Sequence, residues 1–121
     1  MTWRGRRGHD RGMTTAELAV ALPAVVLVLA LCLTAMTLAV DQVRVVDAAR
    51  AAARAASGGE ATATVEQAVG QLTPAGSVLV LTDRGDEVEA VVEAPARASW
   101  LGLLPPARGR AVARWEPGVA P

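Results

Sequence analysis

Residues 12–40 read GMTTAELAVALPAVVLVLALCLTAMTLAV, and this stretch decides the fold. The carboxylate of Glu17 is followed by 23 uncharged residues, from Leu18 to Val40. At about 1.5 Å per residue, a helix of that length spans roughly 35 Å, which exceeds the ~30 Å hydrocarbon core of a bilayer. An ionisable group costs free energy in or beside such a segment, so Glu17 either has a partner or is solvated at the headgroup level.

Charge is distributed unevenly along the chain, although the formal total is zero. Residues 1–12 carry four arginines and one aspartate, a net charge of +3, and the remainder carries −3. Because positively charged flanks stay in the cytoplasm, we expect the N-terminus inside and everything after Val40 outside. The arginine cluster directly precedes an apolar span, which favours a topological role over nucleic-acid binding.

One long helix is predicted from Thr14 or Thr15, where a threonine caps the first turn, to Ser57. Pro23 has no N–H to donate to the carbonyl of Ala19, so a kink is expected there. Beyond Val40 the helix becomes alanine-rich, and the sequence Ser57-Gly58-Gly59 ends it. Charges at three-residue spacing in this part predict two ion pairs, Asp41–Arg44 and Asp47–Arg50.

The region from 58 to 121 predicts a small head with one short helix and about three antiparallel strands. The helix covers 61–72, with Val65, Ala68, Val69 and Leu72 on its apolar face. Strands are expected at 78–81, 88–94 and 110–116, with a hairpin turn at 83–86, a proline-punctuated loop at 95–108 and a frayed tail at 117–121. In the second strand Glu89 and Glu93 alternate with apolar residues, which predicts one solvated face.

A head of 64 residues without a disulfide is marginal alone, so we expect its sheet to pack on the alanine-rich part of the long helix. The predicted class is therefore α+β and membrane-anchored, with a long N-terminal transmembrane helix that extends into a small head. Its parts are a basic cytoplasmic leader (1–12), a long helix (13–57, transmembrane over 18–40) and an extracytoplasmic head (58–121).

The leader and apolar segment together resemble the type IV pilin superfamily. The residues that carry the resemblance are the basic leader ending in Gly12, the carboxylate of Glu17 and the early proline, Pro23. The all-arginine leader, the run Glu17-Leu18-Ala19-Val20-Ala21-Leu22-Pro23 and the small head are most similar to the TadE branch. This branch comprises pseudopilins of the tight-adherence (Flp) pilus system.

The resemblance implies cleavage between Gly12 and Met13 by a membrane-embedded aspartic prepilin peptidase. It also implies that Glu17, then the fifth residue, engages the N-terminal amine of a neighbouring subunit during assembly. A carboxylate and an ammonium attract strongly in a low-dielectric setting, where either alone is costly. The chain departs from the family pattern at Met13 and Leu18, where aromatic residues are commoner, which puts efficient processing in doubt. The implied partners are membrane lipid, other pilin-like subunits, the peptidase and the Tad inner-membrane assembly machinery.

Two alternatives remain open for the apolar segment. One is an unprocessed single-pass anchor that carries a small extracytoplasmic binding domain. The other is a secretory signal peptide, although its cleavage site near Thr37-Leu38-Ala39 would be a poor small-x-small match and the apolar run exceeds the usual 7–15 residues.

No enzymatic activity, cofactor or metal is expected from the sequence. The single histidine, His9, lies in the leader, and the single cysteine, Cys32, lies in the apolar segment. The acidic hairpin around residues 83–93 could bind a divalent cation, but a solvated strand face explains it more simply. A candidate contact patch consists of Trp100, Leu101, Leu103 and Leu104. It could bind a surface or a neighbouring subunit, but the simpler role of these residues is to cover the edge of the small core.

Overall fold

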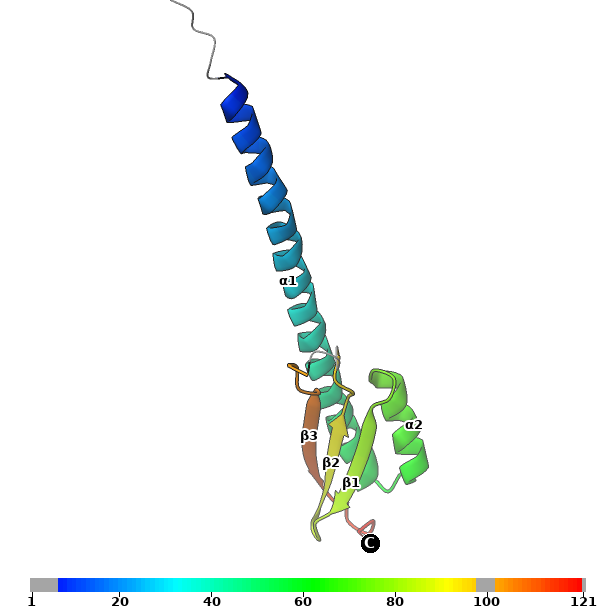
Figure 1. The fold of residues 1–121 in the computed structure, drawn as a ribbon. Coiled ribbons are helices and arrows are strands. Elements are labelled where there is room, and N and C mark those ends of the chain that lie inside the picture. The colour runs from blue at the N-terminus through cyan, green and yellow to red at the C-terminus, as the bar shows by residue number, and fades with distance from the viewer. Residues whose placement is uncertain (1–6, 98–101, 121) are drawn as a thin grey trace, which may run out of the picture. The chain divides into compact units, whose positions relative to one another are not determined.

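The computed structural model describes residues 7–97 and 102–120 and has the predicted α+β class. In chain order the elements are α1 (Arg7–Ser57), α2 (Thr62–Leu72), β1 (Val78–Asp83), β2 (Glu87–Glu93) and β3 (Arg108–Arg114) (Figure 1). The chain divides into two units, Met1–Met36 and Thr37–Pro121. We call the second the folded unit, because it contains the C-terminal part of α1, together with α2 and the sheet.

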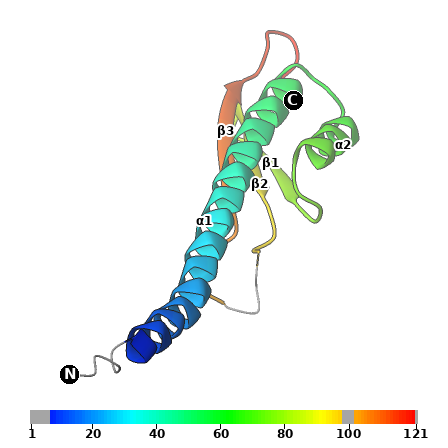
Figure 2. The ribbon, with the colours of Figure 1, turned by 90° about the horizontal axis from the view of Figure 1, so that it is seen from above.

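The three strands of the folded unit form one antiparallel sheet in the order β1-β2-β3. The last part of α1 covers one face of this sheet, and α2 lies beside β1 (Figures 1 and 2). The β1–β2 connection is the predicted hairpin, in which the Arg84 N–H donates to the Glu87 carbonyl at 2.8 Å. Gly85 adopts a φ of +85° in this turn, a left-handed conformation that favours glycine.

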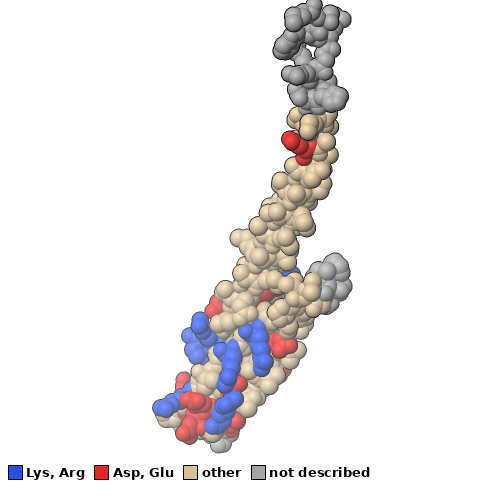
Figure 3. Space-filling model, turned by 60° about the vertical axis from the view of Figure 1, so that its left-hand side comes forward, with Lys and Arg blue, Asp and Glu red and all other residues tan. Residues whose placement is uncertain are grey.

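The N-terminal unit consists, in its described part, of the first portion of α1. This helix already includes Arg7, so the predicted start at Thr14 or Thr15 is wrong. Glycines at 8 and 12 cost only about 1 kcal/mol each in a helix, and no proline precedes Pro23, so helix propagation continues through them. The helix also continues through Pro23, and the kink expected there stays a prediction. The surface of the apolar stretch is almost free of charge (Figure 3).

The C-terminus of α1 is confirmed at Ser57. The N–H of Gly59 donates to the Ala56 carbonyl at 3.0 Å, and the N–H of Glu60 donates to the Ala55 carbonyl at 3.1 Å. This pair of bonds with Gly59 at a φ of +86° is the Schellman motif, which satisfies the last carbonyls of the helix.

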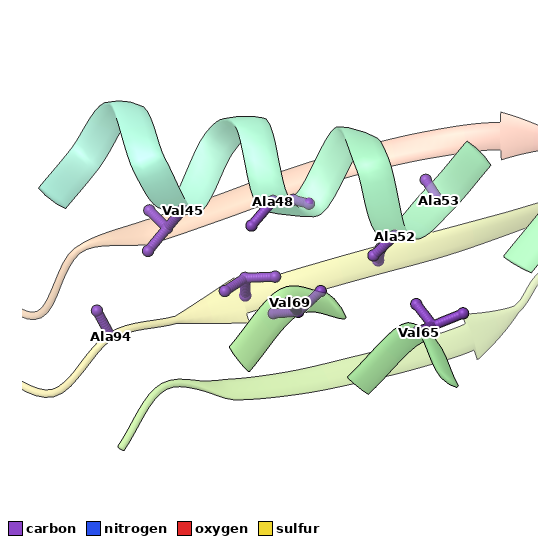
Figure 4. Close-up of a cluster of buried hydrophobic side chains, with 10 residues drawn as sticks. Val45, Ala48, Ala52, Ala53, Val65, Val69 and Ala94 are labelled. Atoms are coloured by element: carbon purple, nitrogen blue, oxygen red, sulfur yellow. The ribbon is translucent and has the colours of Figure 1, made fainter. Parts of the chain in front are cut away.

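Small side chains build the core between α1, α2 and the sheet (Figure 4). As predicted, the sheet packs on the alanine-rich part of α1. Among the residues that the structure describes, the largest fully buried side chains are three valines, Val45, Val65 and Val92. The helix contributes Val45, Ala48, Ala49, Ala52 and Ala53, α2 contributes Val65 and Val69, and β2 with the residue after it contributes Ala90, Val92 and Ala94. Such side chains let backbones approach closely. At Gly109 of β3, an added Cβ would lie only 2.6 Å from the backbone nitrogen of Val46.

Three details of the folded unit differ from the sequence prediction. In α2 only Val65 and Val69 are buried, whereas Ala68 is exposed and Leu72 is 52% exposed, because a narrow stripe suffices to contact so small a core. Strand β3 begins two residues earlier than predicted. The tail at 117–121 is not simply frayed: the Val119 N–H donates to the Glu116 carbonyl at 3.1 Å, and Val119 lies against Gly59.

Candidate membrane and assembly surface

The apolar part of α1 in the N-terminal unit is exposed over its whole circumference. Its large side chains, from Leu18 to Met36, each retain between 57% and 74% of their accessible surface. A helix that is apolar all round requires cover from lipid or from other protein. By length and composition α1 can cross a membrane, and none of its most apolar 18-residue window is buried.

Glu17 lies exposed on α1, four residues after Met13. It is the only charged side chain between Gly12 and Val40. Residues four apart share one face of a helix, so the carboxylate lies one turn, or about 6 Å along the axis, from the backbone of Met13. The structure thus places the two predicted processing and assembly positions on one exposed face.

Gly12 is an interior residue of α1, and an added Cβ there would meet no atom within 4 Å in the part of the chain that the structure describes. Met13 is 67% exposed. The fold therefore gives no steric reason for glycine at position 12. An alanine would favour the helix by roughly 0.5–1 kcal/mol.

The candidate contact patch is only partly visible. Trp100 and Leu101 lie outside the described residues. Leu103 is 78% exposed and Leu104 is half-buried, both in the connection between β2 and β3.

Asp41, the first charged residue after the apolar segment, forms an ion pair that the sequence did not predict. Its buried carboxylate accepts hydrogen bonds from Nε of Arg97 and, at 3.0 Å, from Nη2 of Arg97. The expected ion pair with Arg44 does not form, since the two-pronged guanidinium of Arg97 binds both carboxylate oxygens; Arg44 acts on Asp41 through its charge alone. These hydrogen bonds hold the pKa of Asp41 below its ordinary value of 3.8, against the opposing effect of burial.

Gln42, the next residue of α1, contacts the start of β3. Its Nε2 donates to the Arg108 carbonyl at 2.9 Å, and its Oε1 accepts from the Arg108 N–H at 3.3 Å. A side-chain amide thus satisfies both backbone groups of one strand residue. The other predicted pair, Asp47–Arg50, is confirmed at 3.7 Å, but both side chains are 66% exposed, so it stabilises the fold little.

The sheet face that points away from α1 carries glutamates on β2 and arginines on β3. Glu89 was expected to be solvated, but it is buried because its Oε2 contacts Nη2 of Arg110 at 2.9 Å and Nη2 of Arg84 at 2.5 Å. The register also places Glu87 opposite Arg114 and Glu93 opposite Arg108. Ion pairs to Arg84 in the hairpin turn and Arg110 on β3 therefore account for the burial of Glu89.

The structure does not support the cation site considered for the hairpin. Within residues 7–97 and 102–120, no three His, Cys, Asp or Glu side chains are grouped so as to hold a metal ion. The carboxylate of Glu89 is already engaged by two guanidinium groups.

Sequence reasoning missed the contacts of Asp41 and Gln42 because their partners lie 56 and 66 residues away in the chain. No local spacing encodes such pairs. The burial of Asp41, which only the structure reveals, points to a partner, since charges are rarely buried unpaired.

Comparison with known proteins adds no family: no family model, curated protein or solved structure matches the chain. The architecture itself is pilin-like, since a long apolar N-terminal helix packs through its later part against a small three-stranded antiparallel sheet.

Proposed function

We propose that this chain is a pseudopilin-like subunit of a tight-adherence type IV pilus or a related secretion apparatus, similar to the TadE branch. One observation carries the proposal. The exposed, apolar stretch of α1 bears a single carboxylate, Glu17, at its start, and the later part of the helix contributes to the core of a small antiparallel head. The role is structural rather than enzymatic.

The proposed setting is a cell membrane, with residues 18–40 across the bilayer, the N-terminus in the cytoplasm and the folded unit outside. The net charge of +3 on residues 1–12 supports this orientation. The proposed partners are lipid, other pilin-like subunits, prepilin peptidase and the Tad inner-membrane assembly machinery.

Cleavage after Gly12 would require the first turns of α1 to unwind, since the bond between Gly12 and Met13 lies inside the helix. Glycine lowers the cost of that unwinding by about 0.5–1 kcal/mol relative to alanine. The absence of any steric need for glycine in the described fold supports a role for Gly12 outside the fold, such as recognition by the peptidase.

After cleavage, the amine of Met13 and the carboxylate of Glu17 would lie one turn apart on one exposed face. A neighbouring subunit in the membrane could then accept the ammonium of one chain at the carboxylate of the other. At the cytoplasmic edge of the bilayer both charges are less well solvated than in bulk water, so their pairing would favour assembly.

Mass spectrometry of the N-terminus tests the proposal in cells that contain an active prepilin peptidase. We expect the membrane form to start at Met13, and Gly12→Val to retain the leader. Ala24→Leu, a bulky change at an exposed position of the same helix, should be processed normally. An intact Met1 in the wild type would favour an unprocessed anchor, and a start near Val40 would favour a signal peptide.

A further inference from the structure

Both ends of the connection between β2 and β3 are tied to adjacent residues of α1. At the first end, the guanidinium of Arg97 holds the buried carboxylate of Asp41 with two hydrogen bonds. At the second end, the backbone of Arg108 exchanges two hydrogen bonds with the side chain of Gln42. The connection is therefore fixed to one point along the helix.

This point lies at the end of the apolar segment. Asp41 directly follows Val40, the last of the 23 uncharged residues, and both belong to the folded unit. Val40 and Val43 keep 44% and 60% of their surface exposed, so this end of the folded unit presents apolar side chains beside the exposed polar residues Gln42, Arg44 and Arg108. The opposite end, with the β1–β2 hairpin, lies near Ser57, where Glu116 bonds to Ser57 and Trp115 to Asp86.

Residues 102–107 of the connection read GLLPPA and contain no polar side chain. Leu103 is 78% exposed there, the highest exposure of any large apolar side chain in the described residues. Surface loops are ordinarily rich in polar residues, so an apolar one indicates contact with an apolar medium. Pro105 and Pro106 have no N–H groups, which reduces the number of backbone donors that such a medium would leave unsatisfied.

The two ties limit how far this loop can extend from the end of the apolar segment. Leu103 is five residues from Arg108, so its backbone lies within about 18 Å of that residue at full extension. The hydrocarbon core of a bilayer is about 30 Å thick, and the whole bilayer with its headgroups is about 40–45 Å thick. The interfacial region on each side therefore extends several ångströms beyond the core.

We propose that residues 102–107 form a membrane-contacting loop that inserts Leu103 into the outer interfacial layer of the bilayer. The occupant is lipid rather than protein because the connection that carries the loop is hydrogen-bonded to Asp41 and Gln42, which directly follow Val40, the last residue of the proposed membrane span. The inference rests on the proposed membrane anchoring of α1. The loop gives the folded unit a second contact with the membrane and so restricts its orientation at the surface.

Single cysteines carrying an environment-sensitive fluorophore test this proposal in the full chain. In a Cys32→Ser background, labels are placed by Leu103→Cys in the loop, Asp86→Cys at the hairpin and Leu29→Cys in the apolar segment. Each protein is reconstituted in phosphatidylcholine vesicles. Fluorescence is then quenched either by phospholipids with a nitroxide at a shallow or deep position or by aqueous iodide.

We expect shallow nitroxide lipid to quench the label at 103 at least twofold more than the label at 86, with iodide giving the reverse order. If 103 responds to iodide like 86 and not to lipid, the loop faces water and the inference is overturned. Protection of 103 from both quenchers would mean that protein covers the loop, which also overturns it. The label at position 29 separates the two proposals. If deep nitroxide lipid quenches it but shallow nitroxide lipid does not quench the label at 103, only the proposed loop contact is refuted. If no nitroxide lipid quenches the label at 29, both the membrane anchor and the loop contact are refuted.

Discussion

Replacing Gly109 by alanine tests the close packing of β3 on α1. The added Cβ would lie 2.5 Å from the carbonyl carbon of Val45 and 2.6 Å from the nitrogen of Val46, and closer still to the Val45 oxygen. Ordinary van der Waals contact begins near 3.4 Å, so the strand and the helix backbone would have to separate by about 1 Å. All three atoms belong to the helix backbone, so no side-chain rotation can relieve the clash.

Overpacking of a well-packed core costs typically 1–3 kcal/mol, and a clash with backbone belongs at the upper end of that range. For a folded unit of this size, each kcal/mol shifts the melting temperature by roughly 4–8 °C, so we expect Gly109→Ala to lower it by at least about 8 °C. Circular dichroism of the full chain in detergent micelles, recorded on heating, measures this shift.

Gly70→Ala is the matched control, because glycine 70 lies in α2 with open space around its Cβ position. It should stabilise the folded unit by about 0.5–1 kcal/mol through helix propensity. If Gly109→Ala melts within 1 °C of the wild type, β3 does not pack against Val45 as described, and the position of the sheet on α1 is wrong.

Three further predictions concern the charged groups. Glu17→Ala and Glu17→Gln should leave membrane insertion intact and the head folded but reduce subunit cross-linking and pilus yield; equal yields for wild type and both variants would make Glu17 merely interfacial. The pKa of Asp41 is lower in the folded state than its ordinary value of 3.8. The pair with Arg97 therefore contributes its full stability above pH 3.8, and this contribution is lost as the pH falls from 3.8 through the folded-state pKa. Asp41→Asn should therefore weaken the folded unit at neutral pH and flatten this part of the acid unfolding curve, whereas the exposed Asp47→Asn should leave the curve unchanged. A reporter fused after Pro121 should be active only if it works outside the cytoplasm, and the opposite result would contradict the proposed topology.

The sequence predicted those features of the fold that depend on local patterns. These patterns are local in sequence: the apolar run, the glycines after Ser57 and the alternation in β2. The corresponding helices and strands begin and end within two residues of their predicted bounds, except for the start of α1. A threonine at position 14 or 15 can cap a helix but does not have to, and α1 runs through both from Arg7. The predicted start was therefore wrong.

Contacts between distant residues could not be predicted in this way. Glu89 was expected to be solvated from the alternation of β2 alone, but its burial depends on Arg110, which the strand register brings across from β3. The Asp41–Arg97 pair depends likewise on where the connection crosses α1. For the assembly surface, the sequence supplied Gly12, Met13 and Glu17 by resemblance. The structure adds that all three are exposed and that Met13 and Glu17 share one helix face. Cleavage and pairing stay predictions.

The way in which β3 lies along α1 has a mechanical consequence. The strand is joined to the helix near both ends, through Arg108 at Gln42 and through Glu116 at Ser57, about 22 Å apart along the helix axis. A tensile load applied along α1 therefore acts on the interface in shear, and the contacts at Arg108, Gly109 and Glu116 resist it together, whereas a load across the interface would break them one after another. The small side chains between the two backbones, and the glycine seated against Val45, leave little room for the strand to slide. The folded unit is thus built to resist force in the direction in which its own long helix would transmit it.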